Sequence, residues 1–196
     1  YILGADVVAF ETQFAASCGA GHAVGVGNGL DALHLVLRAW DIGPGDEVIV
    51  PSHTYIATYL AVTMTGATPV PVESREATGN LDPDRIDAAV TARTRAMIAV
   101  HLYGQPAEMG PVMAVAARHG LRVLEDAAQA HGARWAGRRA GALGHAAAWS
   151  FYPTKNLGAF GDAGAVTTSD DETANRLRAL RNYGSRRKYY NEVPGY

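Results

Sequence analysis

Short apolar runs alternate along this chain with longer segments of helical periodicity, and this alternation constrains the fold more than any other feature. The runs that fit strands are Glu47–Val50, Thr68–Val72, Ala96–His101, Arg122–Glu125, Ala146–Phe151 and Ala163–Thr167. The segments that fit helices are Asp6–Ser17, Asp31–Trp40, Ile56–Thr65, Asp82–Val90, Met109–His119 and Glu172–Arg181. Helices between consecutive strands form right-handed crossovers, so the sequence predicts an α/β fold with a mostly parallel central sheet and helices on both faces.

The bulk composition argues against several classes of partner. A formal net charge of -2, from 17 basic and 19 acidic residues, gives no electrostatic basis for binding nucleic acid or a membrane surface. The longest apolar stretch, 55–72, is interrupted by threonine, glycine and proline and does not fit a membrane-spanning helix. Cys18 is the only cysteine, which fits helix packing in a reducing cytoplasm. We therefore expect a cytoplasmic protein with no nucleic acid and no membrane partner.

A glycine-rich segment marks the first candidate binding element. Residues 25–30 precede a predicted helix, whose first N–H groups and positive dipole end favour a phosphate. Glycine turns before helices are common, and no Gly-Lys-Ser/Thr follows, so the segment is not a P-loop. Taken alone, it is weak evidence for a phosphate site.

Three side chains that follow predicted strands could carry chemistry, because ligands of parallel sheets gather at the carboxyl ends of the strands. Asp126 is either a helix N-cap or a carboxylate that keeps a pyridinium nitrogen protonated in a pocket. Ser150 is either an ordinary strand serine or a hydroxyl contact to phosphate. Lys155 is either a solvated surface charge or an amine that forms a Schiff base with an aldehyde.

Three stretches of the chain, 46–58, 125–133 and 150–164, together resemble the sugar aminotransferases of the DegT/DnrJ/EryC1/StrS family. The resemblance covers essentially all 196 residues. It implies the type I pyridoxal-phosphate (PLP) aminotransferase fold, with residues 1–196 as the PLP-binding large domain. The chain begins without methionine and ends in a loop, so we expect a fragment that lacks its N-terminal start and a C-terminal small domain.

The resemblance also implies roles for individual residues toward pyridoxal 5'-phosphate. Lys155 would be the catalytic residue, which forms the Schiff base and later moves the proton. The other implied cofactor contacts are Asp126 to the pyridine nitrogen, Gln129 near the ring hydroxyl, Tyr55 on the ring face, and Gly29, Leu30 and Ser150 around the phosphate. Tyr55 could instead be a core aromatic residue and Gln129 a cap. No metal is implied.

The family pattern and this chain differ at two positions, and three further residues are candidates for substrate contact. Leu30 stands where relatives more often carry threonine, which removes one hydroxyl from the phosphate site, and Ala163 stands where many carry glycine. His53 is a substrate contact or a surface histidine. Arg186 and Lys188 belong to a basic run that lies near the dimer interface in the family. This run either meets a nucleotide-sugar diphosphate in the neighbouring subunit's active site or is a solvated helix end and loop.

The resemblance implies a homodimeric transaminase with a shared active site. It would move an amino group, with glutamate as the expected donor, to a nucleotide-linked keto-deoxyhexose, expected to be dTDP-linked. The stretches 51–58 and 182–186 are most similar to enzymes that aminate the third carbon of the sugar. The alternatives are a PLP- or PMP-dependent sugar dehydratase of the same fold, in which histidine tends to replace the lysine, and a non-catalytic PLP-binding regulatory protein.

Overall fold

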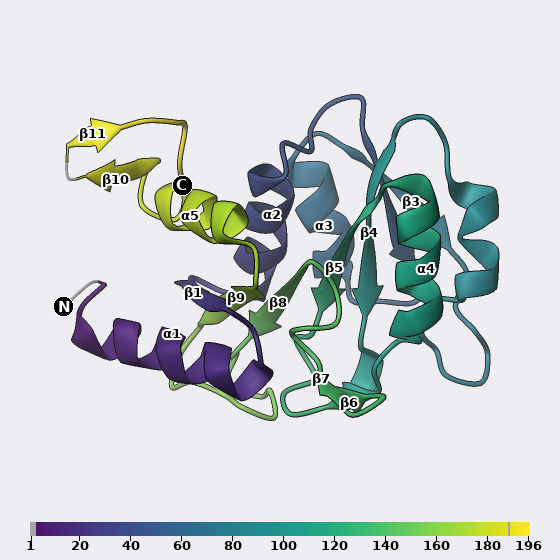
Figure 1. The fold of residues 1–196 in the computed structure, drawn as a ribbon, viewed down its shortest axis with the longest axis horizontal. Helices are drawn as coiled ribbons and strands as arrows, with labels where there is room; N and C mark the ends of the chain where they lie inside the picture. Colours follow the sequence, from purple (N-terminus) through teal and green to yellow (C-terminus); the bar gives the residue numbers. More distant parts are fainter. Residues whose placement is uncertain (1–2, 188) are drawn as a thin grey trace.

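The computed structural model describes residues 3–187 and 189–196, and in this part of the chain a seven-stranded sheet forms the centre of the fold (Figure 1). The strands lie in the order β1-β9-β8-β5-β4-β2-β3. Their bounds are β1 His22–Val26, β2 Glu47–Pro51, β3 Thr68–Val72, β4 Thr94–Val100, β5 Arg122–Asp126, β8 Ala146–Ser150 and β9 Gly164–Thr168. Strand β9 is antiparallel to both β1 and β8, and the other neighbouring pairs are parallel. The mostly parallel sheet that the sequence predicts is therefore confirmed.

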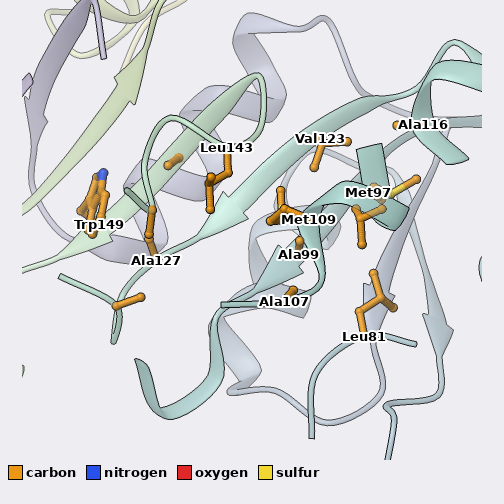
Figure 2. Close-up of a cluster of buried hydrophobic side chains, with 14 of the residues drawn as sticks. Leu81, Met97, Ala99, Ala107, Met109, Ala116, Val123, Ala127, Leu143 and Trp149 are labelled. Carbon is orange, nitrogen blue, oxygen red and sulfur yellow. The ribbon is translucent and has the colours of Figure 1, made fainter. Parts of the chain in front are cut away.

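Helices cover both faces of this sheet, as predicted. Their bounds are α1 Ala5–Cys18, α2 Gly29–Ala39, α3 Ile56–Met64, α4 Met109–His119 and α5 Asp171–Leu180. Side chains of α2, α3 and α5 share one buried cluster, and those of α1 and α4 share the other. Strand β4 contributes side chains to both clusters, because Ile98 faces the first cluster while Met97 faces the second. Figure 2 shows the second cluster, where Met97 lies near Met109 and Val123.

Strand β1 is a difference from the sequence-based prediction, which assigned no strand before Glu47. The strand lies at the edge of the sheet, and its backbone at Gly25 is bound by one side chain from α1 and one from the residue after α5. Glu11 Oε1 accepts a hydrogen bond from Gly25 N at 2.8 Å, and Arg181 Nη1 donates to Gly25 O at 2.9 Å. Glu11 and Arg181 also pair with each other. These side chains satisfy the outward N–H and C=O groups of Gly25, a contact that a local glycine-rich pattern cannot reveal.

The predicted helix over Asp82–Val90 is wrong. Two 3₁₀ turns, Pro83–Arg85 and Asp87–Ala89, occupy the segment instead. Asp82 Oδ1 accepts from Asp84 N at 3.2 Å and from Arg75 Nη2 at 3.0 Å. The capping contact therefore reaches two residues ahead, which fits the tighter 3₁₀ geometry.

Short elements complete the described structure. They are a 3₁₀ turn over Leu102–Gly104 and two small hairpins, β6 (Arg134–Trp135) with β7 (Arg138–Arg139) and β10 (Ser185–Arg187) with β11 (Tyr190–Asn191). The β10–β11 hairpin projects beyond α5, on the side of the molecule away from α4 (Figure 1). Within the described residues, every helix is too short or too polar to cross a lipid bilayer.

Candidate functional site

A cavity of about 610 Å³ opens at the carboxyl ends of the parallel strands. Residues from six segments line it: 28–30 after β1, 54–57 after β2, 100–102 at the end of β4, Asp126 with 128–129 at the end of β5, residues of 150–155 at the end of β8, and Asp162 before β9. This is the edge of the sheet at which the sequence predicts a ligand. Segments that lie far apart in the sequence therefore meet around one space.

The glycine-rich segment forms the start of helix α2 next to strand β8. Asn28 caps the helix, because its Oδ1 accepts from Asp31 N at 2.8 Å. A Cβ atom at Gly29 would lie only 2.8 Å from the Cβ of Ser150, so glycine is needed for this close approach. The buried Ser150 hydroxyl accepts from Tyr152 N at 3.3 Å. Gly29, Leu30 and Ser150 thus lie together, where helix N–H groups without intrahelical acceptors can hold a phosphate.

Asp126 ends strand β5 as a buried carboxyl on the wall of the cavity. Its Oδ2 accepts from Thr58 Oγ1 at 2.9 Å, and its Oδ1 accepts from Ala128 N at 3.3 Å. Burial raises the pKa of Asp126, although these two hydrogen bonds oppose the rise. The segment that follows is a turn rather than a helix, so the helix N-cap interpretation is wrong. A buried carboxyl of this kind favours a cationic partner on its cavity side.

Lys155 lies in the loop after β8 and lines the same cavity. Its backbone N donates to Tyr152 O at 2.8 Å. The next residue, Asn156, is bound twice to His131, through Oδ1 to Nδ1 at 2.7 Å and through Nδ2 to the backbone O at 3.2 Å. Burial lowers the pKa of His131, whose ring packs against Trp149 with centroids 5.0 Å apart. These contacts therefore hold the loop that carries Lys155 against the buried aromatic residues.

Gln129 and Tyr55 flank the cavity. Gln129 Oε1 accepts from Tyr103 N at 2.7 Å, so its amide oxygen is bound to backbone and its amide nitrogen remains a donor. Tyr55 precedes helix α3, and 73% of its surface is exposed. The interpretation of Tyr55 as a core aromatic residue is therefore wrong, and its ring lines the cavity instead.

Two of the three candidate substrate residues, His53 and Arg186, lie apart from this group. His53 is exposed, and neither it nor Arg186 lines the cavity. A Cβ on Gly79 would lie 3.5 Å from His53 Nδ1, which places this ring beside the 73–82 loop. Arg186 lies on the β10–β11 hairpin, where its Nε is 3.5 Å from Glu192 Oε2. Lys188 lies outside the described residues.

Sequence reasoning missed two groups that support the site. One is the pair Thr54, which precedes α3, and Thr58 in its first turn, with their Oγ1 atoms 2.8 Å apart. The other is Glu125, a fully buried neighbour of Asp126 that accepts from His101 Nε2 at 2.9 Å. The backbone N atoms of Gly141, Leu143 and Gly144 also donate to it, at 2.9, 2.8 and 2.7 Å. Burial opposes ionisation of Glu125, but these donors outweigh it and the pKa is lowered. The sequence signal for Glu125 was an acidic residue at the end of an apolar strand.

Comparison with known proteins identifies relatives over the whole chain. The model of the DegT/DnrJ/EryC1/StrS aminotransferase family matches residues 1–196. The chain is 62% identical over 195 residues to dTDP-3-amino-3,4,6-trideoxy-alpha-D-glucose transaminase of Streptomyces venezuelae, a match that covers 100% of this chain and 52% of the relative. The chain therefore spans about half the length of this curated relative.

Two solved structures are similar to the fold described above. S. venezuelae DesV in complex with a ketimine intermediate superposes with a TM-score of 0.97 at 62% identity, over 98% of this chain and 52% of that chain. NtdA from Bacillus subtilis with bound cofactor PMP superposes with a TM-score of 0.93 at 32% identity, over 98% of this chain and 44% of that chain. Together with the sheet order and the helices on both faces, these similarities place the chain in the type I PLP aminotransferase fold class.

Proposed function

Because the chain belongs to the DegT/DnrJ/EryC1/StrS aminotransferase family, we propose that it is part of a PLP-dependent transaminase that aminates a nucleotide-linked keto-deoxyhexose. The proposed sugar carrier is dTDP, which the name of the S. venezuelae relative contains, and the proposed amino donor is glutamate. The observation that carries the proposal is the convergence of Lys155, Asp126 and the Gly29–Ser150 contact on one cavity. In this proposal residues 1–196 are the PLP-binding large domain of a cytoplasmic enzyme.

The residues around the cavity fit pyridoxal 5'-phosphate. When bound, this cofactor supplies an aldehyde that accepts the amino group and a ring that stabilises negative charge at the reacting carbon. The start of α2 at Gly29 and Leu30, with the Ser150 hydroxyl, would hold the phosphate. Asp126 would keep the ring nitrogen protonated, Gln129 would donate to the ring hydroxyl, and Tyr55 would cover the ring face.

Lys155 is the group to which we assign proton transfer. It is the only amine among the described residues that line the cavity. Its Nζ would hold the cofactor before the donor arrives, then take a proton from the donor and return it at the neighbouring atom. The dehydratase alternative is disfavoured because this lysine is present. The regulatory alternative leaves the arrangement of amine, carboxyl and phosphate site without a role.

The charge around the cavity supports a shared active site in a homodimer. Among the described residues that line it, Lys155 is the only one with a permanently basic side chain, while Asp126 and Asp162 are acidic. Burial, and secondarily the nearby Asp162, raises the pKa of Asp31 at the start of α2. A phosphate and a nucleotide-sugar diphosphate need more positive charge than this site contains. We therefore propose that a second copy supplies cations.

The apolar rim of the cavity supports the same proposal. Tyr55, Ile56, Leu60 and Met64 are exposed on and before α3, with 73%, 57%, 42% and 52% of their surfaces accessible. Exposed apolar residues that lie close together are typical of a protein interface. Arg186 and Lys188 are our candidates for the cations that a second copy would bring, and His53 is a candidate for contact with the sugar.

Cofactor binding can be tested through the lysines, because the sequence contains only Lys155 and Lys188. PLP added to the whole protein should give a visible absorbance band, and borohydride should fix the pyridoxyl group to Lys155 in a peptide identified by mass spectrometry. Lys155→Ala should abolish both signals, and Lys188→Arg is the matched control that should retain them. A protein that stays colourless, or one labelled only at Lys188, would contradict the proposal.

Substrate class and subunit exchange need separate assays. Glutamate should convert the bound cofactor to its amine form, and a dTDP-linked 3-keto-deoxyhexose should reverse the spectral change. If only keto-sugars on another nucleotide reverse it, the dTDP assignment is wrong. Mixing chains that carry Lys155→Ala with chains that carry Arg186→Ala should restore activity, because some mixed dimers would hold one intact site. Failure to recover activity, with both variants folded and exchanging subunits, would contradict a shared site.

A further inference from the structure

Two threonine hydroxyls form a continuous chain of hydrogen bonds to Asp126. Thr58 lies in the first turn of α3 and is fully buried, and its Oγ1 lies 2.9 Å from Asp126 Oδ2. Thr54 lies four residues earlier, lines the cavity and has its Oγ1 2.8 Å from that of Thr58. The chain therefore runs from the cavity wall, through the interior, to the carboxyl at the end of β5.

The ionisation state of Asp126 determines the direction of both hydrogen bonds. A hydroxyl carries one proton, and a carboxylate can only accept. When Asp126 is ionised, Thr58 must give its proton to Oδ2, so Thr54 is the donor between the two hydroxyls. Thr54 thus polarises Thr58, and the hydrogen bond from Thr58 to the carboxylate is strengthened.

The hydrogen bond from Thr58 is also the shorter of the two hydrogen bonds described above to this carboxyl. The other, from Ala128 N to Oδ1, is 3.3 Å long. Hydrogen bonds to a charged acceptor are about twice as strong as neutral ones, and the low dielectric of a buried site strengthens them further. His101 and Lys155 also act on Asp126, but through charge rather than through a hydrogen bond. The Thr58 hydroxyl is therefore the main directional restraint on the carboxyl.

We propose that Thr58, supported by Thr54, is a positioning residue that fixes the Asp126 carboxyl and sets how strongly it holds the proton of the cofactor's ring nitrogen. The inference rests on the proposed binding of PLP. Thr58 acts through Asp126, and its hydroxyl is committed on one side to the carboxyl and on the other to Thr54. Without the hydroxyl, the carboxylate loses a donor and takes a larger share of the proton from the ring nitrogen.

Matched variants separate the hydroxyl from the packing of the side chain. Thr58→Val keeps the volume and removes the hydroxyl, whereas Thr58→Ser keeps the hydroxyl and removes the methyl group. In the whole protein, PLP titration of the cofactor-free form should show affinity about tenfold weaker for Thr58→Val and near wild type for Thr58→Ser. Thr54→Val should fall between wild type and Thr58→Val, because it removes only the supporting donor.

A second readout is the pH midpoint at which the absorbance of bound PLP changes. A ring nitrogen that shares its proton more with Asp126 withdraws fewer electrons, so the group linked to Lys155 keeps its proton to higher pH. The midpoint should therefore rise in Thr58→Val and stay near wild type in Thr58→Ser. The unfolding free energy of the cofactor-free variants shows whether the fold is kept. If Thr58 had a purely structural role, the variants would rank by the packing of the side chain and not by the presence of the hydroxyl.

Several outcomes would overturn the proposal. Affinity and midpoint that are unchanged in Thr58→Val, or a larger loss in Thr58→Ser than in Thr58→Val, would assign Thr58 to packing. Wild-type behaviour of Thr54→Val would remove Thr54 from the chain of donors. A wild-type protein that binds no PLP would instead refute the proposed function, so the two failures are distinguishable.

Discussion

Replacing Gly29 with alanine tests the close approach of α2 to β8. The added Cβ would lie 2.8 Å from the Cβ of Ser150, whereas ordinary contacts begin at 3.4 Å, so the two elements must separate by several tenths of an ångström. Overpacking of this kind costs about 1–3 kcal/mol, and exchanging glycine for alanine in a helix returns up to about 1 kcal/mol. We expect the cofactor-free protein to lose about 1–2 kcal/mol of unfolding free energy, with a Tm lower by roughly 2–8 °C.

The same separation should weaken cofactor binding. It increases the distance between the N–H groups at the start of α2 and the Ser150 hydroxyl, which together form the proposed phosphate site. Losing one hydrogen bond to a charged group corresponds to an affinity about tenfold weaker or more. Absorbance titration of the cofactor-free protein with PLP measures this loss directly.

Two backgrounds isolate the steric cause of the stability loss. In Ser150→Gly the opposing Cβ is absent, so Gly29→Ala should cost less unfolding free energy than in the wild type. In Ser150→Ala the Cβ remains, and the cost should be unchanged. Equal costs in all three backgrounds, or a Gly29→Ala variant with wild-type stability and PLP affinity, would refute the steric reasoning.

Three further predictions follow from the contacts around the site. Burial raises the pKa of Asp126, so the folded state holds this proton more tightly than the unfolded chain does. The cofactor-free protein should therefore lose stability as pH rises from the ordinary aspartate range through the raised pKa, and Asp126→Asn should flatten this part of the profile in urea unfolding. Arg181→Met leaves Glu11 without its cation and should cost about 3 kcal/mol, and additive effects with Glu11→Gln in a double-mutant cycle would contradict a coupled pair. Asn156→Ala removes both contacts to His131 and should weaken PLP binding several-fold while the unfolding free energy falls by less than about 1 kcal/mol, and an unchanged PLP affinity would contradict this role.

The central strands were predictable because both of their faces are buried. Strand β4 alternates between the two hydrophobic clusters, so it reads as a continuous apolar run with no polar face. Strand β1 was not predicted, since it pairs with β9, and its outward backbone at Gly25 is bound by Glu11 and Arg181, all of them contacts that a local pattern does not show. The 3₁₀ turns after Asp82 depend on Arg75, a contact that periodicity also cannot show.

The candidate site also contains residues that the sequence predicted and residues that it did not. Asp126 and Lys155 could be placed because each follows a strand at the ligand-binding edge of a parallel sheet. Thr58 was not predicted as a site residue, because a threonine in an apolar helix looks ordinary until the carboxyl that it contacts is known. Arg186 does not join the site of its own chain, because it lies on a projecting hairpin and does not line the cavity, so its contact with substrate stays a prediction.

Both edge strands of the central sheet carry features that hinder pairing with a further strand. At one edge, Glu11 and Arg181 bind the outward N–H and C=O groups of Gly25 in β1. At the other, Thr68 and Val72 of β3 bond toward β2, so Pro69 and Pro71 between them face outward, where proline offers no N–H group. Both features hinder edge-to-edge pairing of this sheet with a second copy of the chain. We therefore expect assembly at these two edges to depend on side chains rather than on a continuous backbone ladder.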